Sequence, residues 1–321
     1  MTRVFARLAN GGVAAAIVTT LALHLIGTVL IPGYSSPFSI RAMLVLAALL
    51  AVTSIGQTLV IILGGIDLSV PFVIGFANVV AAGLTGQGVP FAVVLVAVIV
   101  LALLIGGING ALSSLLRIHP LIVTLGVGTV VQGAVLIWTG GFASGNAPTF
   151  VSSFVSIGGS IGPIPVPGLI PSLIVVTVAV SLLLSRTAYG RRLYAQGGNP
   201  SAAPFALINP VRMWIITFAL SALFAALAGV LLLGFTGSAY GDVGQPYMFQ
   251  TIAAVVIGGT SLMGGRGSFL GTLAGCTVLT EINTLLIGLG LQPSMVQAAL
   301  GVIIILLVSL YGREPHLRTT I

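Results

Sequence analysis

The sequence predicts an all-α membrane protein in which about ten transmembrane helices form a single domain over residues 1–321. Three observations predict this class. Hydrophobic residues make up 57% of the chain, and the mean hydropathy is +1.23. Charged residues make up only 5%, whereas a soluble domain carries about 25%. The aromatic content is 7% and charges do not alternate along the chain, which favours helices over a membrane barrel.

Apolar runs follow one another along the whole chain. They cover residues 13–31, 40–63, 70–85, 91–115, 119–139, 169–185, 213–234, 249–263, 268–287 and 294–311. The first run follows Arg3 and Arg7, as in a signal peptide. It is long for the apolar core of a signal peptide and no A-x-A cleavage site follows it, so we expect an uncleaved helix. The third and eighth runs are short for a crossing, which needs about 20 residues, so we expect discontinuous helices there.

The basic residues, which are all arginine, test this number of spans. With ten spans, both termini and every second loop lie on the same side of the membrane. Every arginine except Arg41 falls in these termini and loops. Cytoplasmic loops carry an excess of basic residues. We therefore expect both termini, and the long loop at about 186–212, to lie in the cytoplasm.

Missing and scarce residue types exclude several activities. The chain contains no lysine, so it has neither the P-loop lysine of an ATPase nor an amine for a Schiff base. Its single cysteine, Cys276, and its three histidines show no metal-ligand spacing. The arginines form no basic face, so we expect no nucleic-acid partner despite a net charge of +7. We expect a protein that is not an enzyme and binds no metal or cofactor itself.

Of the four acidic residues, Glu314 is expected to be solvated in the C-terminal tail, and three are candidates for a function. Asp67 lies in the segment Gly64–Ser69, between the second and third runs. Paired glycines end helices and Asp or Ser begin them, so one interpretation is a helix break capped by Asp67. The other is a discontinuous helix that lines a transport path, and both can hold. Glu281 either lies near the outer end of its helix or takes part in proton coupling. Asp242 either caps a turn or meets an external partner.

Uncharged polar side chains within the runs are the remaining candidates. They are Gln57, Asn78, Asn109, Thr124, Gln132, Gln250 and Asn283. Buried amides need partners, so each either bonds a neighbouring helix or binds a polar solute. A sugar would suit these neutral donors and acceptors. Separately, Gly267, Gly271 and Gly275 recur every four residues and predict close packing of helices.

Several motifs resemble those of a known family. Gly64-Gly65-Ile66-Asp67-Leu68-Ser69 resembles the signature of the ribose-type permeases of bacterial sugar ABC importers. Further blocks follow in the same order: Asn109-Gly110, Ile122–Gly126, Arg186–Arg191, Gly197–Asn199, and Ala253–Leu262 with Gly264, Gly265 and Gly267. The resemblance extends over residues 55–275.

This resemblance implies a fold, a function and a set of partners. The fold would be that of a type II ABC importer permease. The chain would be the membrane subunit that moves a monosaccharide or similar small polar solute across the bacterial inner membrane into the cytoplasm. A separate ATPase subunit would hold ATP and its magnesium ion. A periplasmic or lipid-anchored binding protein would deliver the solute, and a second permease chain, identical or related, would complete the path.

The resemblance also implies where the ATPase docks. The coupling segment would be a short helix within Asn199, Pro200, Ser201, Ala202, Ala203, Pro204, Phe205, Ala206, Leu207 and Ile208. Family members often have an arginine and a Gly-Ile pair in this segment, where this chain has Pro204, Leu207 and Ile208. Pro71 also replaces a glycine that usually follows the Asp-Leu-Ser-Val run.

Two functional hypotheses follow. In the first, the chain is an ABC importer permease, and Gln57, Asp67, Ser69, Asn109 and Gln250 lie nearest the solute path. In the alternative, it is an ion-coupled secondary transporter that uses Asp67 or Glu281. ATP-dependent uptake distinguishes the first from uptake driven by an ion gradient.

Overall fold

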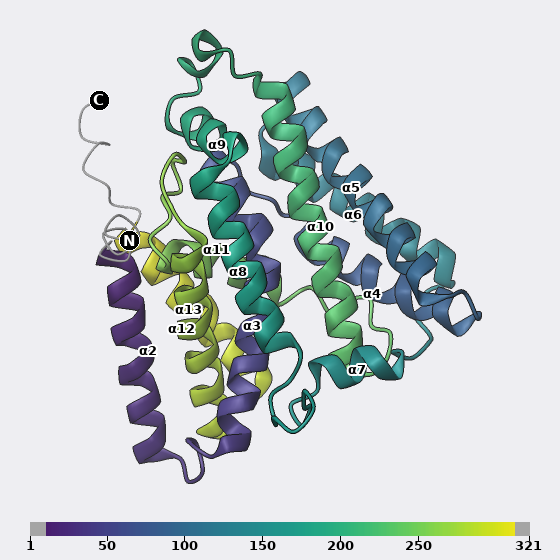
Figure 1. Cartoon of the computed structure of the whole chain (residues 1–321), viewed down its shortest axis with the longest axis vertical. Coiled ribbons are helices and arrows are strands. Elements are labelled where there is room, and N and C mark those ends of the chain that lie inside the picture. Colours follow the sequence, from purple (N-terminus) through teal and green to yellow (C-terminus); the bar gives the residue numbers. More distant parts are fainter. Residues whose placement is uncertain (1–10, 312–321) are drawn as a thin grey trace.

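The protein folds as an assembly of helices in the computed structural model, which describes residues 11–311 (Figure 1). The elements are α2 (Gly11–Leu30), α3 (Pro37–Leu63), α4 (Val70–Gly86), α5 (Phe91–Leu115), α6 (Pro120–Thr139), α7 (Thr149–Val155), α8 (Leu169–Arg186), α9 (Ala188–Gly198), a 3-10 helix η1 (Ala203–Ala206), α10 (Pro210–Thr236), α11 (Tyr247–Ile257), α12 (Phe269–Gly288) and α13 (Pro293–Tyr311). Within the described residues, β structure is limited to two isolated bridges. The predicted all-α class is confirmed.

Each predicted apolar run forms one helix, and the two runs noted as short form short helices. Seven helices are long and apolar enough to cross a membrane. α4 has 17 residues and α11 has 11. Two helices, α7 and α9, were not predicted because neither is an apolar run. Arg3, Arg7, Arg313 and Arg318, used in the prediction of topology, lie outside the described residues.

α3 forms the centre of the molecule. In the most apolar stretch of α3, 94% of the residues are buried. The corresponding share is 17% in α2, which lies at the edge of the molecule (Figure 1). Ser36 caps the start of α3 by accepting a hydrogen bond from the backbone N–H of Ser39, and Pro37 lies in the first turn of this helix. Gly64 ends it in a left-handed conformation, with φ of 96°. The paired glycines therefore end this helix as the sequence predicted.

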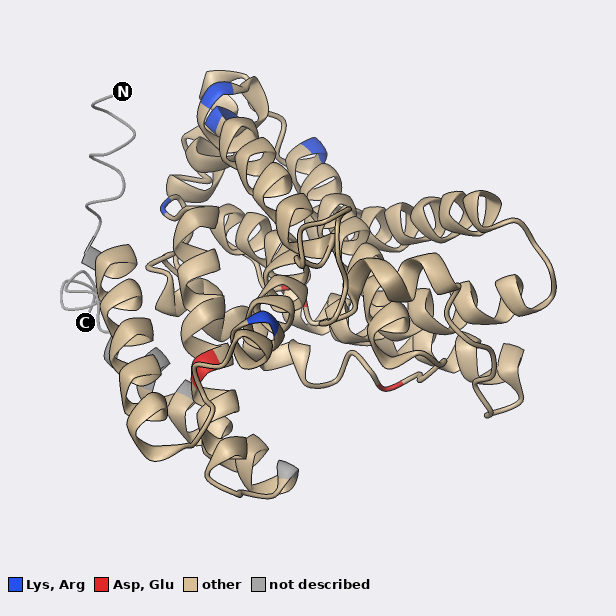
Figure 2. Ribbon diagram, turned by 60° about the horizontal axis from the view of Figure 1, so that its bottom comes forward, with Lys and Arg blue, Asp and Glu red and all other residues tan. Residues whose placement is uncertain are grey.

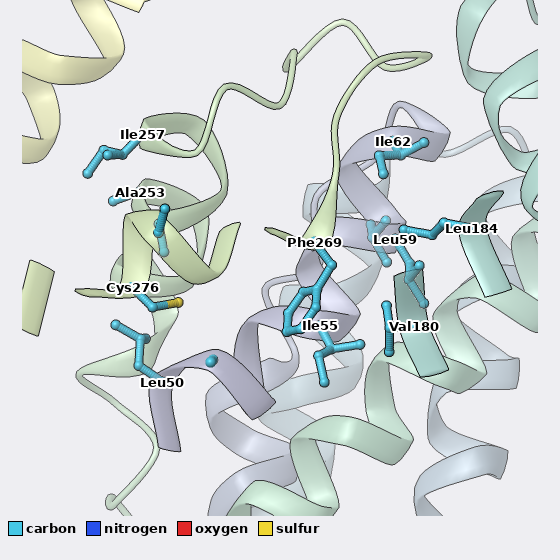
Figure 3. Packing of buried hydrophobic residues seen from close by; sticks show 14 of the residues in the cluster. Leu50, Ile55, Leu59, Ile62, Val180, Leu184, Ala253, Ile257, Phe269 and Cys276 are labelled. Atoms are coloured by element: carbon cyan, nitrogen blue, oxygen red, sulfur yellow. The ribbon is translucent and has the colours of Figure 1, made fainter. Parts of the chain in front are cut away.

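α10 packs beside α3 and also contacts α4 and α5, so these helices enclose most of the buried core. One cluster of buried side chains joins α3, α8, α11 and α12; Figure 3 shows Leu50, Ile55, Leu59, Ile62, Val180, Leu184, Ala253, Ile257, Phe269 and Cys276. Cys276 is fully buried among apolar side chains. It contributes to packing here.

Glycines bring α11 and α12 unusually close. A Cβ at Gly275 would collide with the carbonyl oxygen of Ala254, and one at Gly271 would collide with that of Gly258. Helices can approach this closely only where side chains are absent. The predicted packing ridge is confirmed for Gly271 and Gly275, while Gly267 lies in the turn before α12.

Arginines within the described residues gather mainly at one end of the molecule (Figure 2). This end carries α9 and the loop after it, whereas α7 lies at the opposite end (Figure 1). Arg41 is bonded elsewhere: its guanidinium donates to the carbonyl oxygens of Pro37 and Pro165. The uneven distribution agrees with the pattern seen in the sequence.

Candidate functional site

The break between α3 and α4 is built around Asp67. Residues 65–69 form no regular secondary structure, and α4 begins at Val70. Asp67 is only 1% exposed. Its Oδ1 accepts hydrogen bonds from the backbone N–H of Ser69 at 2.9 Å and from the Ser69 hydroxyl at 2.6 Å. Its Oδ2 accepts from the Ser221 hydroxyl of α10 at 2.7 Å.

Side chains of two further helices complete this cluster. The Asn109 amide of α5 donates to the Ser69 hydroxyl at 2.9 Å, and the Thr124 hydroxyl of α6 accepts from the backbone N–H of Leu68 at 2.9 Å. We call Asp67, Ser69, Asn109, Thr124 and Ser221 the break cluster. It fixes the interruption between α3 and α4 to three other helices.

Asp67 is stabilised by neutral donors alone. No arginine side chain pairs with it among residues 11–311, where the one contact within salt-bridge distance joins His24 and Glu281. Three hydrogen bonds to a buried carboxylate offset part of the cost of its removal from water. The helix break is confirmed, but the predicted cap is not. The N-cap residue of α4 is Ser69, α4 has no side-chain cap hydrogen bond, and the Asp67 carboxylate bonds the N–H of Ser69 itself.

The five predicted pathway residues fall in different places. Asp67, Ser69 and Asn109 meet in the break cluster. Gln57 is fully buried on α3, and neither atom of its amide has a hydrogen-bond partner in the structure. Gln250 of α11 instead lines a large cavity. The Asn109 amide oxygen also has no partner.

This cavity has a volume of about 830 Å³ and is open on one side. α3, α10, α11, α12, α13 and the segment after α10 contribute to its walls. Its polar lining is mostly uncharged: Thr236, Tyr240, Gln245, Tyr247, Gln250, Thr280, Asn283 and Gln297, with Asp242 as the acidic member. Gln250, Asn283 and Asp242 were candidates from the sequence. Gln245, which lies in a loop, and Gln297, an amide within the last apolar run, were not.

Asp242 separates this cavity from a smaller one of about 360 Å³ between α4 and α6. Tyr240, Asp242 and Gln245 line both. The Gln132 amide of α6 donates to Asp242 Oδ1 at 3.2 Å. Asp242 is therefore exposed to both spaces and also connects its loop to α6.

Glu281 joins α12 to the loop between α2 and α3. Its Oε2 accepts from the Tyr34 hydroxyl at 2.8 Å, and its Oε1 lies 3.1 Å from Nδ1 of His24 on α2. Burial, followed by the hydrogen bond with Glu281 and the charge of Glu281, raises the pKa of the Tyr34 hydroxyl, so it remains a donor. Glu281 lies within α12, seven residues before its last residue, and is buried. Both interpretations of Glu281 stay predictions.

The long loop at 186–212 is ordered by two short helices. The Thr187 side chain caps α9 by accepting from the N–H of Gly190. The hydroxyls of Tyr189 and Thr217 share a hydrogen bond at 3.0 Å, which joins α9 to α10. Burial raises the pKa of Tyr189 to about 12, although the bond with Thr217 acts in the opposite direction. Asn209 caps α10 by accepting from the N–H of Arg212.

The predicted coupling segment contains η1 and an apolar tip. Phe205 is 91% exposed and Leu207 is 93% exposed, while Ala203 and Ile208 are buried and anchor the turn. Leu207 adopts a left-handed conformation with φ of 58°, which is costly for a residue with a side chain. Two large apolar side chains therefore project from this end. We call Phe205 and Leu207 the loop tip.

Fold and site together define a multi-pass membrane permease: a helical bundle with an interrupted helix, a cavity that contains several polar groups at one end, and a projecting loop tip at the other. A family model described as a branched-chain amino acid transport system / permease component matches residues 39–308. The chain belongs to this family of permease components, and it is a multi-pass protein of the inner membrane.

Relatives of known name match most of the chain. The fructose import permease protein of Rhizobium meliloti is 34% identical over 304 residues, which cover 92% of this chain and 83% of the relative. The ribose import permease protein of Bacillus subtilis strain 168 is 34% identical over 298 residues, with coverage of 90% and 89%. The galactose/methyl galactoside import permease protein of Escherichia coli K12 is 30% identical over 323 residues, with 94% of each chain covered. The predicted resemblance to import permeases is confirmed.

Proposed function

We propose that this chain is the membrane subunit of an ATP-binding cassette importer and moves a monosaccharide, or a similar small polar solute, into the cytoplasm. The observation that carries the proposal is the placement of the cavity and the loop tip at opposite ends of α10. α10 has 27 residues, which at 1.5 Å per residue span about 40 Å. The tip precedes its first residue, and Thr236 at its last turn lines the cavity.

The lining of the cavity supports a neutral polar solute. Amides and hydroxyls supply donors and acceptors, and such groups orient a ligand inside an otherwise apolar pocket. Gln245, Gln250, Asn283 and Gln297 would contact the solute first. The names of the relatives, which include fructose, ribose and galactose import, support a sugar.

The buried polar groups would serve the inner part of the path. Both side-chain amide atoms of Gln57 and the side-chain amide oxygen of Asn109 have no hydrogen-bond partner in the structure. We propose that Gln57, Asp67, Ser69 and Asn109 approach the solute when the helices move apart, whereas Gln250 contacts it in the conformation described here. Buried amides without partners cost free energy, so a role in another conformation would account for them.

The loop tip supports docking of an ATPase. The exposed apolar pair Phe205 and Leu207 resembles an anchor for a hydrophobic groove. ATP and its magnesium ion would bind to this partner, because the chain lacks a P-loop lysine. The end of the molecule at which most arginines gather would face the cytoplasm, and both termini would lie in the cytoplasm. A binding protein would deliver solute to the opposite end, and a second permease chain would close the open side of the cavity.

The test is reconstitution of the chain with the products of neighbouring genes. The chain is co-purified with its ATPase, placed in lipid, and assayed for ATP hydrolysis with a candidate binding protein that carries ribose, fructose or galactose. The proposal predicts hydrolysis that rises with one loaded binding protein and falls when Phe205 and Leu207 are both replaced by serine. A chain that binds no ATPase, and that transports solute only with an ion gradient, would instead favour the secondary transporter.

A further inference from the structure

Three segments that are far apart in the sequence meet backbone to backbone beside the loop tip. They are the end of α3 at Ile62–Gly64, the end of α9 at Gly197–Gly198, and the turn between α11 and α12 at Gly264–Gly265. The backbone N–H of Gly265 donates to the carbonyl oxygen of Ile62 at 2.8 Å. A Cβ at Gly197 would collide with that same oxygen and would lie 2.8 Å from the Gly265 nitrogen. We call this contact the glycine junction.

The third segment needs glycine for two reasons. Gly264 and Gly265 have φ of 83° and 70°, a conformation that strains any L-residue. A Cβ at Gly264 would also lie 2.9 Å from the Gly197 carbonyl oxygen, and one at Gly265 would lie 2.5 Å from the Gly198 Cα. No side chain separates the three backbones here. The junction is therefore as tightly packed as these backbones allow.

The junction lies between the two functional regions. Gly197 lies two residues before Asn199, at which the segment that carries the loop tip begins. Ile62 lies near the end of α3, directly before the break that Asp67 braces. A hydrogen bond also ties α9 to the turn between α11 and α12, because the Tyr194 hydroxyl donates to the carbonyl oxygen of Gly267 at 2.8 Å. A displacement of α9 must therefore move the end of α3, or open this contact.

We propose that the glycine junction transmits movement of the loop tip to the break between α3 and α4, so that Gly197 is a positioning residue for transport. The proposal rests on the proposed function, in which the tip binds an ATPase. Close-packed backbone transmits displacement because it has no free volume to absorb it. A methyl group at Gly197 would hold α9 away from Ile62 and loosen this link without touching the tip, the break cluster or the cavity.

The chain offers matched controls for this methyl group. Gly198→Ala adds the same atoms at the next residue, where the nearest contact is the Gly265 Cα at an ordinary 3.8 Å. Gly140→Ala, at the end of α6, adds backbone strain at φ of 61° with nothing within 4 Å of the Cβ. It therefore reports the effect of lost stability alone. Melting temperatures of all three purified variants allow comparison at equal stability.

The first measurement needs no partner. Hydrogen–deuterium exchange is followed in the purified full chain for peptides that cover residues 62–69. Faster exchange of these peptides is expected in Gly197→Ala but not in Gly198→Ala or Gly140→Ala, because only the first separates α9 from α3. Equal exchange in all three variants would overturn the inference, whatever the chain transports.

The second measurement is the ratio of solute taken up to ATP hydrolysed, in proteoliposomes that hold the chain with its ATPase. Gly197→Ala should lower this ratio at least about tenfold, since misplacement by about 1 Å can cost 100-fold where geometry decides activity. ATPase binding should persist, and both controls should keep the wild-type ratio. An unchanged ratio in Gly197→Ala would overturn the transmission role. A wild-type complex without ATP-driven uptake would refute the proposed function and this role with it, even if the exchange result showed the physical link.

Discussion

Asp67 illustrates how one residue holds an interrupted helix inside an apolar bundle. Its carboxylate accepts two bonds from Ser69 and one from Ser221, which join the segment after α3 to α10. Each donor would be left without a partner if the carboxylate were removed. The break is therefore a built feature, and Asp67 need not carry an ion to account for its burial.

We predict that Asp67→Ala lowers the stability of the folded chain by about 2–4 kcal/mol, because buried groups left unsatisfied cost about 1–3 kcal/mol each. Asp67→Asn should cost less, since its amide oxygen can still accept from Ser69. Thermal unfolding of the purified variants in detergent checks this order. Equal stability of wild type and Asp67→Ala would show that the bonds do not brace the break.

Leu207 combines strain with exposure, so its replacement should have two opposite effects. We predict that Leu207→Gly stabilises the chain by about 1 kcal/mol, because glycine adopts the left-handed conformation without penalty. The same change should weaken ATPase binding, because it removes an exposed apolar side chain. Phe205→Ala is the control, since it removes an apolar side chain without relief of strain. Melting temperature and the Kd for the ATPase measure the two effects; a tighter complex with Leu207→Gly would contradict its role in docking.

At the scale of whole helices, the glycines between α11 and α12 determine how closely the two approach. We predict that Gly275→Ala destabilises the chain by about 1–3 kcal/mol, the usual cost of overpacking, because its Cβ would collide with the backbone of Ala254. Gly107→Ala on α5 should be neutral or stabilising by up to about 1 kcal/mol, since its Cβ meets nothing within 4 Å. Thermal unfolding of the two variants measures the difference in stability. Equal unfolding temperatures for Gly275→Ala and Gly107→Ala would mean that α12 can shift without cost.

The sequence predicts the apolar helices well because a bilayer imposes length and composition on each of them. The run at 213–234 corresponds to α10 at Pro210–Thr236, for example. α9 was missed because its residues are too polar for an apolar run, although Thr187 is a typical cap. The partner of Asp67 could not be predicted either. Ser221 lies 154 residues away in the chain, and no periodicity reports which helices meet.

For the molecule as a whole, the predicted site divides into the break cluster, the open cavity and the buried Gln57, which belongs to neither. Asp67, Ser69 and Asn109 were predicted individually, and the packing of α5 and α10 against the break brings them together. Gln250 belongs to the open cavity, along with Gln245 and Gln297, which composition alone did not single out. The open cavity and the break cluster are thus separate regions in the conformation described. In the proposed function, movement of the helices would bring them together.

In the proposed function, energy enters at the loop tip and solute enters at the opposite end of α10. Uptake of radiolabelled ribose, fructose or galactose into proteoliposomes tests it most directly. The vesicles contain the chain with its ATPase, its binding protein is added outside, and ATP is present inside or absent. We predict uptake only with internal ATP, unaffected by ionophores and abolished when Phe205 and Leu207 are both replaced by serine. Uptake without ATP that collapses with an ion gradient, and that persists in the double variant, would contradict the account.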